Sequence, residues 1–279
     1  MLQIWNHFKK NKLCIISFGI ILLLILAAFS ASLITPTGYA DMEYLNKINS
    51  FPSKDNWFGV DSMGRDYFTR VVYGTRVSLF VGFASAIVAL IVGVPLGALA
   101  GYFKGTVDWV VMRLVEIFSV IPSLLLAMFF VTIFGNGLKN IVLIIGLISW
   151  RNICRSVRGE IIVLKEKEFF LAAKAIGIKP LRILFRHLLP NAVAPIIVGV
   201  VLCSSHAIMI EAMLSFLGIG VNPPIPSWGK MISDGIYYIQ FYWHLPLFPS
   251  IFLTITILSL SLIGDGIRDA LDPKIRGKS

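Results

Sequence analysis

Long uncharged apolar runs alternate with shorter polar segments along most of this 279-residue chain. A membrane-spanning helix needs roughly 20 apolar residues, so each long run is a candidate span. The pattern predicts six spans, at residues 13–34, 77–103, 117–138, 140–150, 188–210 and 246–264. The fourth run is too short alone, so we expect its helix to continue past Arg151, whose side chain can snorkel. The fifth is expected to extend toward Leu217.

The first run sets the organisation of the N-terminal part. Its apolar stretch exceeds the ~7–15 residues of a signal-peptide core, so we interpret it as a retained helix, with cleavage as the alternative. Residues 1–76 are then expected to hold the span 13–34 and an external loop. A transmembrane domain over 77–270 and a cytoplasmic tail over 271–279 complete the predicted order.

The composition indicates that a bilayer is the solvent. Hydrophobic residues make up 57% of the chain and charged residues 14%, and the mean hydropathy is +0.82. Soluble domains carry about 25% charged residues. This excludes a disordered chain, a disulfide scaffold and an ordinary cytosolic enzyme, and it predicts an all-α integral membrane protein. The cysteines lack the spacing of a metal site or disulfide framework, so we expect small core residues at Cys14, Cys154 and Cys203.

The Lys and Arg residues that give the net charge of +10 lie in the predicted loops between the spans and at the chain ends. In a soluble protein such a charge would suggest nucleic acid as a partner. Here 18 of the 25 Lys and Arg residues fall on one predicted side of the membrane, and the other seven fall on the opposite side. The positive-inside rule makes the richer side cytoplasmic, and it carries both chain ends.

Two segments are expected on the outer side. Residues 35–76 mix acids with bases and contain two Pro and several Gly, which predicts an ordered external loop. Residues 218–245 combine three prolines with several aromatic side chains. That composition indicates a re-entrant or interfacial piece near the outer surface.

The segment after the fourth span has the periodicity of two short amphipathic helices. The first of these helices would carry four apolar side chains on one face, those of Phe169, Ala172, Ala173 and Ile176. Gly177 is expected to end it, and Pro180 to begin the second helix. The same spacing recurs at Leu181, Leu184, Phe185 and Leu188. We expect a cytoplasmic hairpin with Ala172 and Ala173 exposed near its tip, either docked in a groove of a partner protein or lying on the membrane surface.

The residues of this hairpin resemble the EAA loop of ABC importer permeases. The match runs over Glu168-Phe-Phe-Leu-Ala-Ala-Lys-Ala-Ile-Gly177 and Arg186-His-Leu-Leu-Pro-Asn191, with Leu171 in place of the family's second Glu. The resemblance implies a coupling loop over 160–190 that sits in a cleft of an ATPase subunit. The residues that would carry this role are Glu168, Ala172, Ala173, Gly177, Arg186, Leu189 and Pro190.

Three further blocks resemble the dipeptide/oligopeptide/nickel group of these permeases. They are Phe58-Gly-Val-Asp-Ser-Met-Gly-Arg-Asp66 continuing to Leu79, Glu211 to Gly229, and Gly264-Asp-Gly-Ile-Arg-Asp-Ala-Leu-Asp-Pro273. Val60 stands where the group usually has Thr. The N-terminal layout is similar to the C-type permease, which pairs with a homologous B-type permease.

The resemblance implies a type I importer fold in the cytoplasmic membrane, and a set of partners. These are the B-type permease, two ABC ATPase chains that bind ATP and Mg, and an extracytoplasmic solute-binding protein. The implied cargo is a peptide, and nickel or a metal chelate is the alternative. No cofactor is expected on this chain, and nucleic acid is not expected as a partner.

Small residues recur every four positions in the second span. They are Ser85, Ala89, Gly93, Gly97 and Gly101. This spacing lets two helices approach closely, within the chain or against the second permease. Pro95 and Pro122 lie inside predicted spans and can bend them.

Few ionisable residues are candidates for chemistry. Arg113 and Glu116 are spaced for an ion pair on one helix face. Glu211 lies toward the outer end of the fifth span, where it could hold the loop at Ser227 or, as the second choice, contact substrate. His206 is expected to be a hydrogen-bonded core residue, and no metal site is predicted.

Catalytic motifs are missing. The phosphate-binding pattern Gly-x-x-x-x-Gly-Lys is absent, so we expect ATP on another chain and no enzymatic activity here. We interpret the acids near the C-terminus as solvated tail residues; they are Asp265, Asp269 and Asp272. An ion-gradient-driven transporter is the alternative of another class. It is disfavoured because such proteins carry intramembrane charges or broken helices, and no charge lies in the middle of a predicted span.

Overall fold

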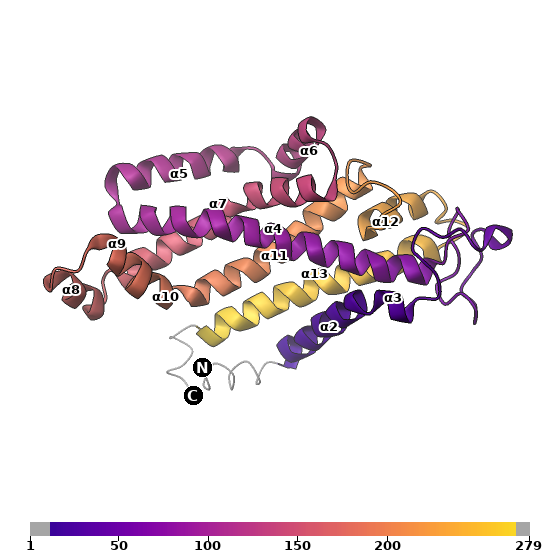
Figure 1. Ribbon diagram of the computed structural model, residues 1–279, viewed down its shortest axis with the longest axis horizontal. Helices are drawn as coiled ribbons and strands as arrows, with labels where there is room; N and C mark the ends of the chain where they lie inside the picture. The colour runs from indigo at the N-terminus through magenta and orange to yellow at the C-terminus, as the bar shows by residue number, and fades with distance from the viewer. Residues whose placement is uncertain (1–11, 272–279) are drawn as a thin grey trace.

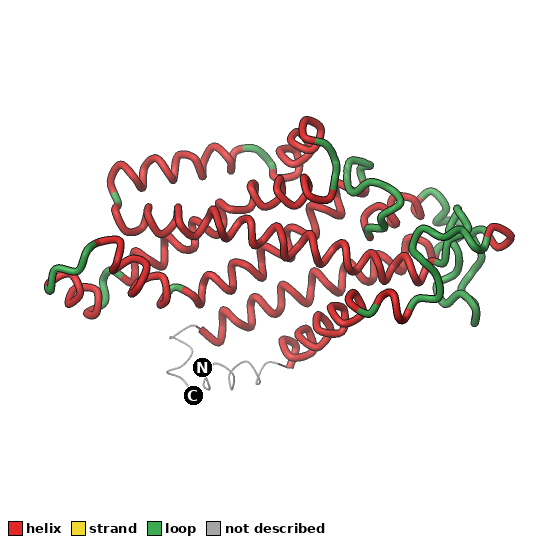
Figure 2. The backbone as a smooth tube through the Cα atoms, in the orientation of Figure 1, coloured by secondary structure: helices red, strands yellow, loops and turns green. Residues whose placement is uncertain are grey.

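The computed structural model describes residues 12–271 as a bundle of helices. Within those residues the backbone is helix and loop, with no strand drawn (Figure 2). The elements in chain order are α2 (Lys12–Phe29), α3 (Ala31–Ile34), η1 (Leu45–Lys47), α4 (Tyr67–Phe103), α5 (Gly105–Val120), α6 (Ser123–Phe134), α7 (Leu138–Leu164), α8 (Glu168–Ala175), α9 (Pro180–Ile183), η2 (Leu184–Leu188), α10 (Leu189–Asn191), α11 (Val193–Phe216), α12 (Trp228–Ile236) and α13 (His244–Leu271). The predicted tail lies outside the described residues except for Leu271.

Five helices are long and apolar enough to cross a membrane: α2, α4, α7, α11 and α13. A sixth span would consist of α5 and α6 together, which meet at an angle of 88°. About six spans were expected, and this number is confirmed. The prediction of a continuous third span over 117–138 is wrong, because most of its residues lie on two helices, α5 and α6, that point in different directions. The fourth span does continue past Arg151, as α7.

The bend between α5 and α6 has a physical cause in Pro122. Proline has no backbone N–H, so it cannot bond to the carbonyl of Phe118 one turn earlier. Arg151 supplies the missing donor: its Nη1 donates to the Phe118 carbonyl at 2.8 Å, and its Nη2 donates to Ser123 Oγ at 2.6 Å. The expectation that Arg151 snorkels is therefore wrong. A charge does lie midway along α7, where it holds the broken span.

The start of α4 lies three turns before the predicted boundary at residue 76. Asp66 caps this helix, because its carboxylate accepts a hydrogen bond from the Thr69 backbone N–H at 2.8 Å. The same carboxylate accepts a bond from Asn56 Nδ2 at 3.0 Å, which ties the external loop to the helix end. The prediction from the apolar run did not include these turns of the helix, because they contain the charged residues Arg70 and Arg76.

Helices α4 and α7 form the centre of the bundle. A methyl group on Gly93 would come within 2.6 Å of the Trp150 carbonyl, and one on Gly101 within 2.8 Å of the Arg158 carbonyl. A methyl group on Gly97 would collide with the Cys154 carbonyl. Ala89 is fully buried in the same seam. The four-residue spacing of small side chains therefore places two helix backbones in direct contact within the chain.

The two ends of the described chain lie at the same end of the bundle. Helix α2 begins where α13 ends, because Gly266 faces Cys14 so closely that a methyl group there would strike the Cys14 sulfur. Figure 1 shows α8 and α9 toward this end, and the loop before α4 with α12 at the opposite end. All three cysteines are buried, as expected.

Candidate functional site

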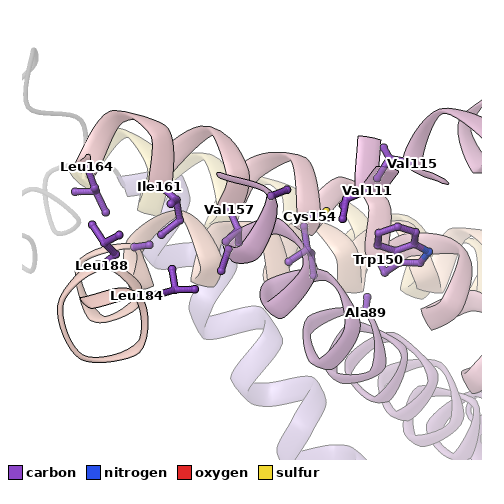
Figure 3. Packing of buried hydrophobic residues seen from close by; sticks show 14 of the residues in the cluster. Ala89, Val111, Val115, Trp150, Cys154, Val157, Ile161, Leu164, Leu184 and Leu188 are labelled. Atoms are coloured by element: carbon purple, nitrogen blue, oxygen red, sulfur yellow. The ribbon is translucent and has the colours of Figure 1, made fainter. Parts of the chain in front are cut away.

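The hairpin formed by α8 to α10 is anchored through one apolar side. Phe170 and Ala173 of α8 are buried in the same cluster as Ile183, Leu184 and Leu188. Figure 3 shows Leu184 and Leu188 beside Ile161 and Leu164, near the end of α7. This packing attaches the hairpin to the end of α7.

The other side of the hairpin is apolar and exposed. Phe169, Ala172 and Ile176 share one face of α8, and the Ile176 side chain is 77% exposed. Leu181 and Phe185 are exposed as well. The expectation that Ala173 is exposed at the tip is wrong, because Ala173 is only 6% exposed. One residue of α-helix rotates the side chain by about 100°, which separates Ala172 from Ala173.

Gly177 forms the joint between α8 and α9. Its φ of +76° lies in the left-handed region that glycine adopts without strain. The backbone N–H of Gly177 donates to the Lys174 carbonyl at 3.1 Å, and that of Ile178 to the Ala173 carbonyl at 3.2 Å. This glycine-terminated end was predicted from sequence, and it lets the chain reverse without a buried contact.

Gly177→Pro is expected to disable the hairpin while leaving the spans inserted. Proline fixes φ near −65°, so it cannot adopt the observed backbone. Nothing lies within 4 Å of the missing side chain, so Gly177→Ala tests strain alone and is expected to cost about 1 kcal/mol. The measurement is ATP-driven uptake by the assembled transporter. Full uptake by the proline variant would contradict a role for this turn.

The remaining hairpin residues lie at its start and along its second half. Glu168 begins α8 and is exposed, as are Arg186 and Pro190, while Leu189 is partly buried against the cluster. The second helix begins at Pro180 as predicted, but residues 184–188 form a π-helix. Such wide turns often occur at functional positions.

Lys165 fastens the start of the hairpin to α4. Its Nζ donates to the Tyr102 carbonyl at 2.5 Å and lies 5.2 Å from the centre of the Tyr102 ring. Burial, together with the nearby cations Lys104 and Lys174, lowers the pKa of Lys165. This contact is a second attachment between the hairpin and the bundle.

A polar face runs along α7 at membrane depth. It consists of Ser149, Asn152, Ser156 and Glu160, which line a cavity of about 640 Å³ together with His206 of α11. The expectation that His206 is a core residue is wrong, because it is exposed on this face. Polar side chains within spans face the bundle interior or water rather than lipid. This cavity is therefore suited to face a water-filled passage.

The sequence contained a signal for this polar face that the search for charges missed. Ser149, Asn152 and Ser156 recur at intervals of three and four, so they share one helix face. Ser149 lies in the predicted fourth run, but Asn152, Ser156 and Glu160 follow residue 150, so the prediction assigns them to the cytoplasmic loop and not to a span.

The other candidate charges take structural positions. Arg113 Nη1 lies 2.6 Å from Glu116 Oε2 on the exposed side of α5. Glu211 is fully buried and accepts a hydrogen bond from Ser215 Oγ at 2.7 Å. Ser227 borders the same carboxyl group and caps α12. Glu211 thus lies beside the start of α12, and it does not line the polar cavity.

The acids near the C-terminus lie on helix rather than in a tail. Asp265 and Asp269 are exposed on α13, and Asp272 is outside the described residues. Within the described part of the chain, no group of three or more His, Cys, Asp or Glu side chains is placed to hold a metal ion.

The chain is similar to known transport proteins over nearly its whole length. Residues 93–277 match the profile of the binding-protein-dependent transport system inner membrane component, and residues 1–52 match the N-terminal TM domain of oligopeptide transport permease C. The dipeptide transport system permease protein DppC of Alkalihalophilus pseudofirmus is 44% identical, covering 98% of this chain and 90% of that protein. The oligopeptide transport system permease protein OppC of Bacillus subtilis is 40% identical, covering 99% and 91%.

A third relative and a solved structure are also similar to this chain. The glutathione transport system permease protein GsiD of Pectobacterium atrosepticum is 38% identical, covering 98% of this chain and 91% of that protein. An inward-facing structure of the MetNI methionine ABC transporter has the same fold, with a TM-score of 0.60, 21% identity, and coverage of 73% of this chain and 97% of that chain. This chain is a multi-pass membrane protein that belongs to the family of binding-protein-dependent transport system inner membrane components.

Proposed function

We propose that this chain is the C-type permease subunit of an ATP-driven importer that carries peptides across the cytoplasmic membrane. Relatives named for dipeptide and oligopeptide transport are 40–44% identical over nearly the whole chain, which supports a peptide cargo over nickel or a metal chelate. The distribution of Lys and Arg supports a cytoplasmic position for the hairpin and both chain ends.

The hairpin carries this proposal. One side is packed against α7 and the other side is apolar and exposed, which is the arrangement needed to pass movement from a partner to the bundle. An ATPase subunit that holds the exposed side in one conformation more tightly than in another would shift the equilibrium between the two. The polar face of α7 then lies on the passage that opens and closes.

The partners follow from this arrangement. A homologous B-type permease would complete the passage beside the polar face, two ATPase chains would bind ATP and Mg, and a solute-binding protein would deliver the cargo outside. This chain would bind no cofactor and catalyse no reaction of its own.

Reconstitution tests the function directly. The complete complex in proteoliposomes, with its binding protein, is expected to accumulate labelled di- and oligopeptides only when ATP is supplied on the side of the ATPase. Uptake driven by a proton or sodium gradient without nucleotide would favour the ion-gradient class. ATP-dependent uptake of a nickel chelate in place of peptides would support the proposed mechanism and contradict the proposed cargo.

Thiol labelling is expected to show that the polar face of α7 is accessible to water. In the assembled complex, Asn152→Cys should react with a hydrophilic thiol reagent, because thiolates form only where water reaches them. Leu143→Cys is the matched control, since Leu143 is exposed on the opposite side of α7 and would face lipid. Equal labelling of both variants, or labelling of Leu143→Cys alone, would place the passage elsewhere.

A further inference from the structure

A second pocket lies at the end of the bundle opposite the hairpin. It has a volume of about 600 Å³ and is formed by the external loop, the first turns of α4, and α12. Two arginines line it, Arg65 and Arg70, together with the carboxylate of Asp61. None of its lining residues lines the polar cavity of α7 and α11, so the two sites are separate.

The two arginines share a single carboxylate. Arg65 Nε lies 2.7 Å from Asp61 Oδ2, and Arg70 Nε lies 3.4 Å from the same oxygen. The other carboxylate oxygen, Oδ1, already accepts hydrogen bonds from the backbone N–H groups of Met63 and Arg65. The neighbouring Lys230 is paired with Asp234 at 2.7 Å. One positive charge therefore has no counterpart among the groups that line the pocket.

Several guanidinium donors also lack an acceptor. Arg65 is only 8% exposed, and within residues 12–271 its side chain donates through Nε alone, so both terminal amino groups are unused. Arg70 Nη1 donates to the Tyr39 carbonyl at 2.9 Å, and its Nη2 has no acceptor in the same part of the chain. These amino groups are not among the buried side-chain atoms that lack a partner, so they are open to the pocket that both arginines line. The planar fork of arginine matches a carboxylate, and the pocket floor therefore offers free donors to an anion.

The rim of the pocket has the composition of a protein interface. Tyr237 is 83% exposed, and Met42, Met63 and Tyr238 are exposed beside it. Interfaces are enriched in Tyr, Met and Arg, and their energetic centres are enriched in Tyr and Arg and surrounded by contacts that exclude water. A small cargo passing along α7 would not need this rim.

We propose that this pocket is a docking site for an acidic side chain of the solute-binding protein, whose carboxylate enters between Arg65 and Arg70. The inference rests on the proposed function, which places this end of the bundle outside the cell and brings a binding protein to it. The exposed tyrosines and methionines would then pack around the inserted carboxylate and exclude water.

Affinity measurements on the complete complex in nanodiscs test this site. Arg65→Gln is expected to weaken binding of the solute-binding protein by about tenfold or more, and to reduce the salt dependence of that affinity. Lys54→Gln is the control, because Lys54 is an exposed cation of the same loop that does not line the pocket. It should change the affinity less than about twofold, since exposed charges outside an interface contribute little. ATP hydrolysis without binding protein should be unchanged in Lys54→Gln.

A second variant avoids the buried ion pair. Tyr237→Ala alters only an exposed side chain, so it should leave the fold intact and still weaken docking by about fivefold. If Tyr237→Ala and a folded Arg65→Gln variant both bind with wild-type affinity, the proposal is overturned. If Arg65→Gln leaves docking unchanged but raises the peptide concentration for half-maximal uptake, the site belongs to the cargo and the proposal is also overturned. A wild-type complex that docks through Arg65 but imports no peptide would refute the proposed cargo and support the docking site.

Discussion

Ala172→Asp is expected to abolish ATP-driven uptake without reducing the amount of inserted chain. Ala172 is exposed beside Phe169 and Ile176, so a carboxylate there stays in water when the hairpin is unoccupied and costs the fold less than about 0.5 kcal/mol. When the ATPase covers this apolar side, the same carboxylate loses its water without gaining a partner, which costs several kcal/mol. Copurification of the ATPase and peptide uptake are the measurements.

The neighbouring residue supplies a control with the same chemistry. Ala173 is buried against the cluster of Leu184 and Leu188, so Ala173→Asp should destabilise the hairpin itself by several kcal/mol. We expect a lower yield and a lower unfolding temperature for Ala173→Asp, and wild-type values of both for Ala172→Asp. If Ala172→Asp retains its ATPase and imports peptide normally, the exposed side is not the docking surface.

The spans could be predicted because lipid imposes a simple requirement. Each crossing helix needs about 20 apolar residues, and hydropathy counts them directly. Hydropathy does not record direction, so Pro122 indicated that the span can bend, but the run, apolar on both sides of it, did not predict a turn of 88° between α5 and α6. The donor that satisfies the broken end, Arg151, comes from another helix, and such a pairing depends on tertiary packing.

The hairpin was predicted in outline for a similar reason. Periodicity and Gly177 located its two helices, since both are local properties of the chain. Which side of α8 is buried depends on the position of α7, and that decided the difference between Ala172 and Ala173. The polar face was missed because the predicted fourth run ends at residue 150, which assigns Ser149 and Asn152 to different segments although their spacing places them on one face.

Gly97→Val is expected to have the largest effect on stability of any change at the centre of the bundle. Gly97 lies against the Cys154 carbonyl, and a side chain there collides with backbone, which cannot rotate away. Separating α4 from α7 to make room would open the packing along Ala89, Gly93 and Gly101. Overpacking of this kind costs about 1–3 kcal/mol or more, and it outweighs the gain of less than about 1 kcal/mol from replacing a helical glycine.

Gly159→Val is the matched control, because Gly159 lies in α7 with no atom within 4 Å of the added side chain. Thermal unfolding of the two variants in the assembled complex compares the same chemical change at a packed and an open position. We expect Gly159→Val to unfold at or slightly above the wild-type temperature and Gly97→Val to unfold well below it. Equal unfolding temperatures would mean that α4 and α7 can move apart freely, and the hairpin could then no longer transmit movement to the passage through their shared seam.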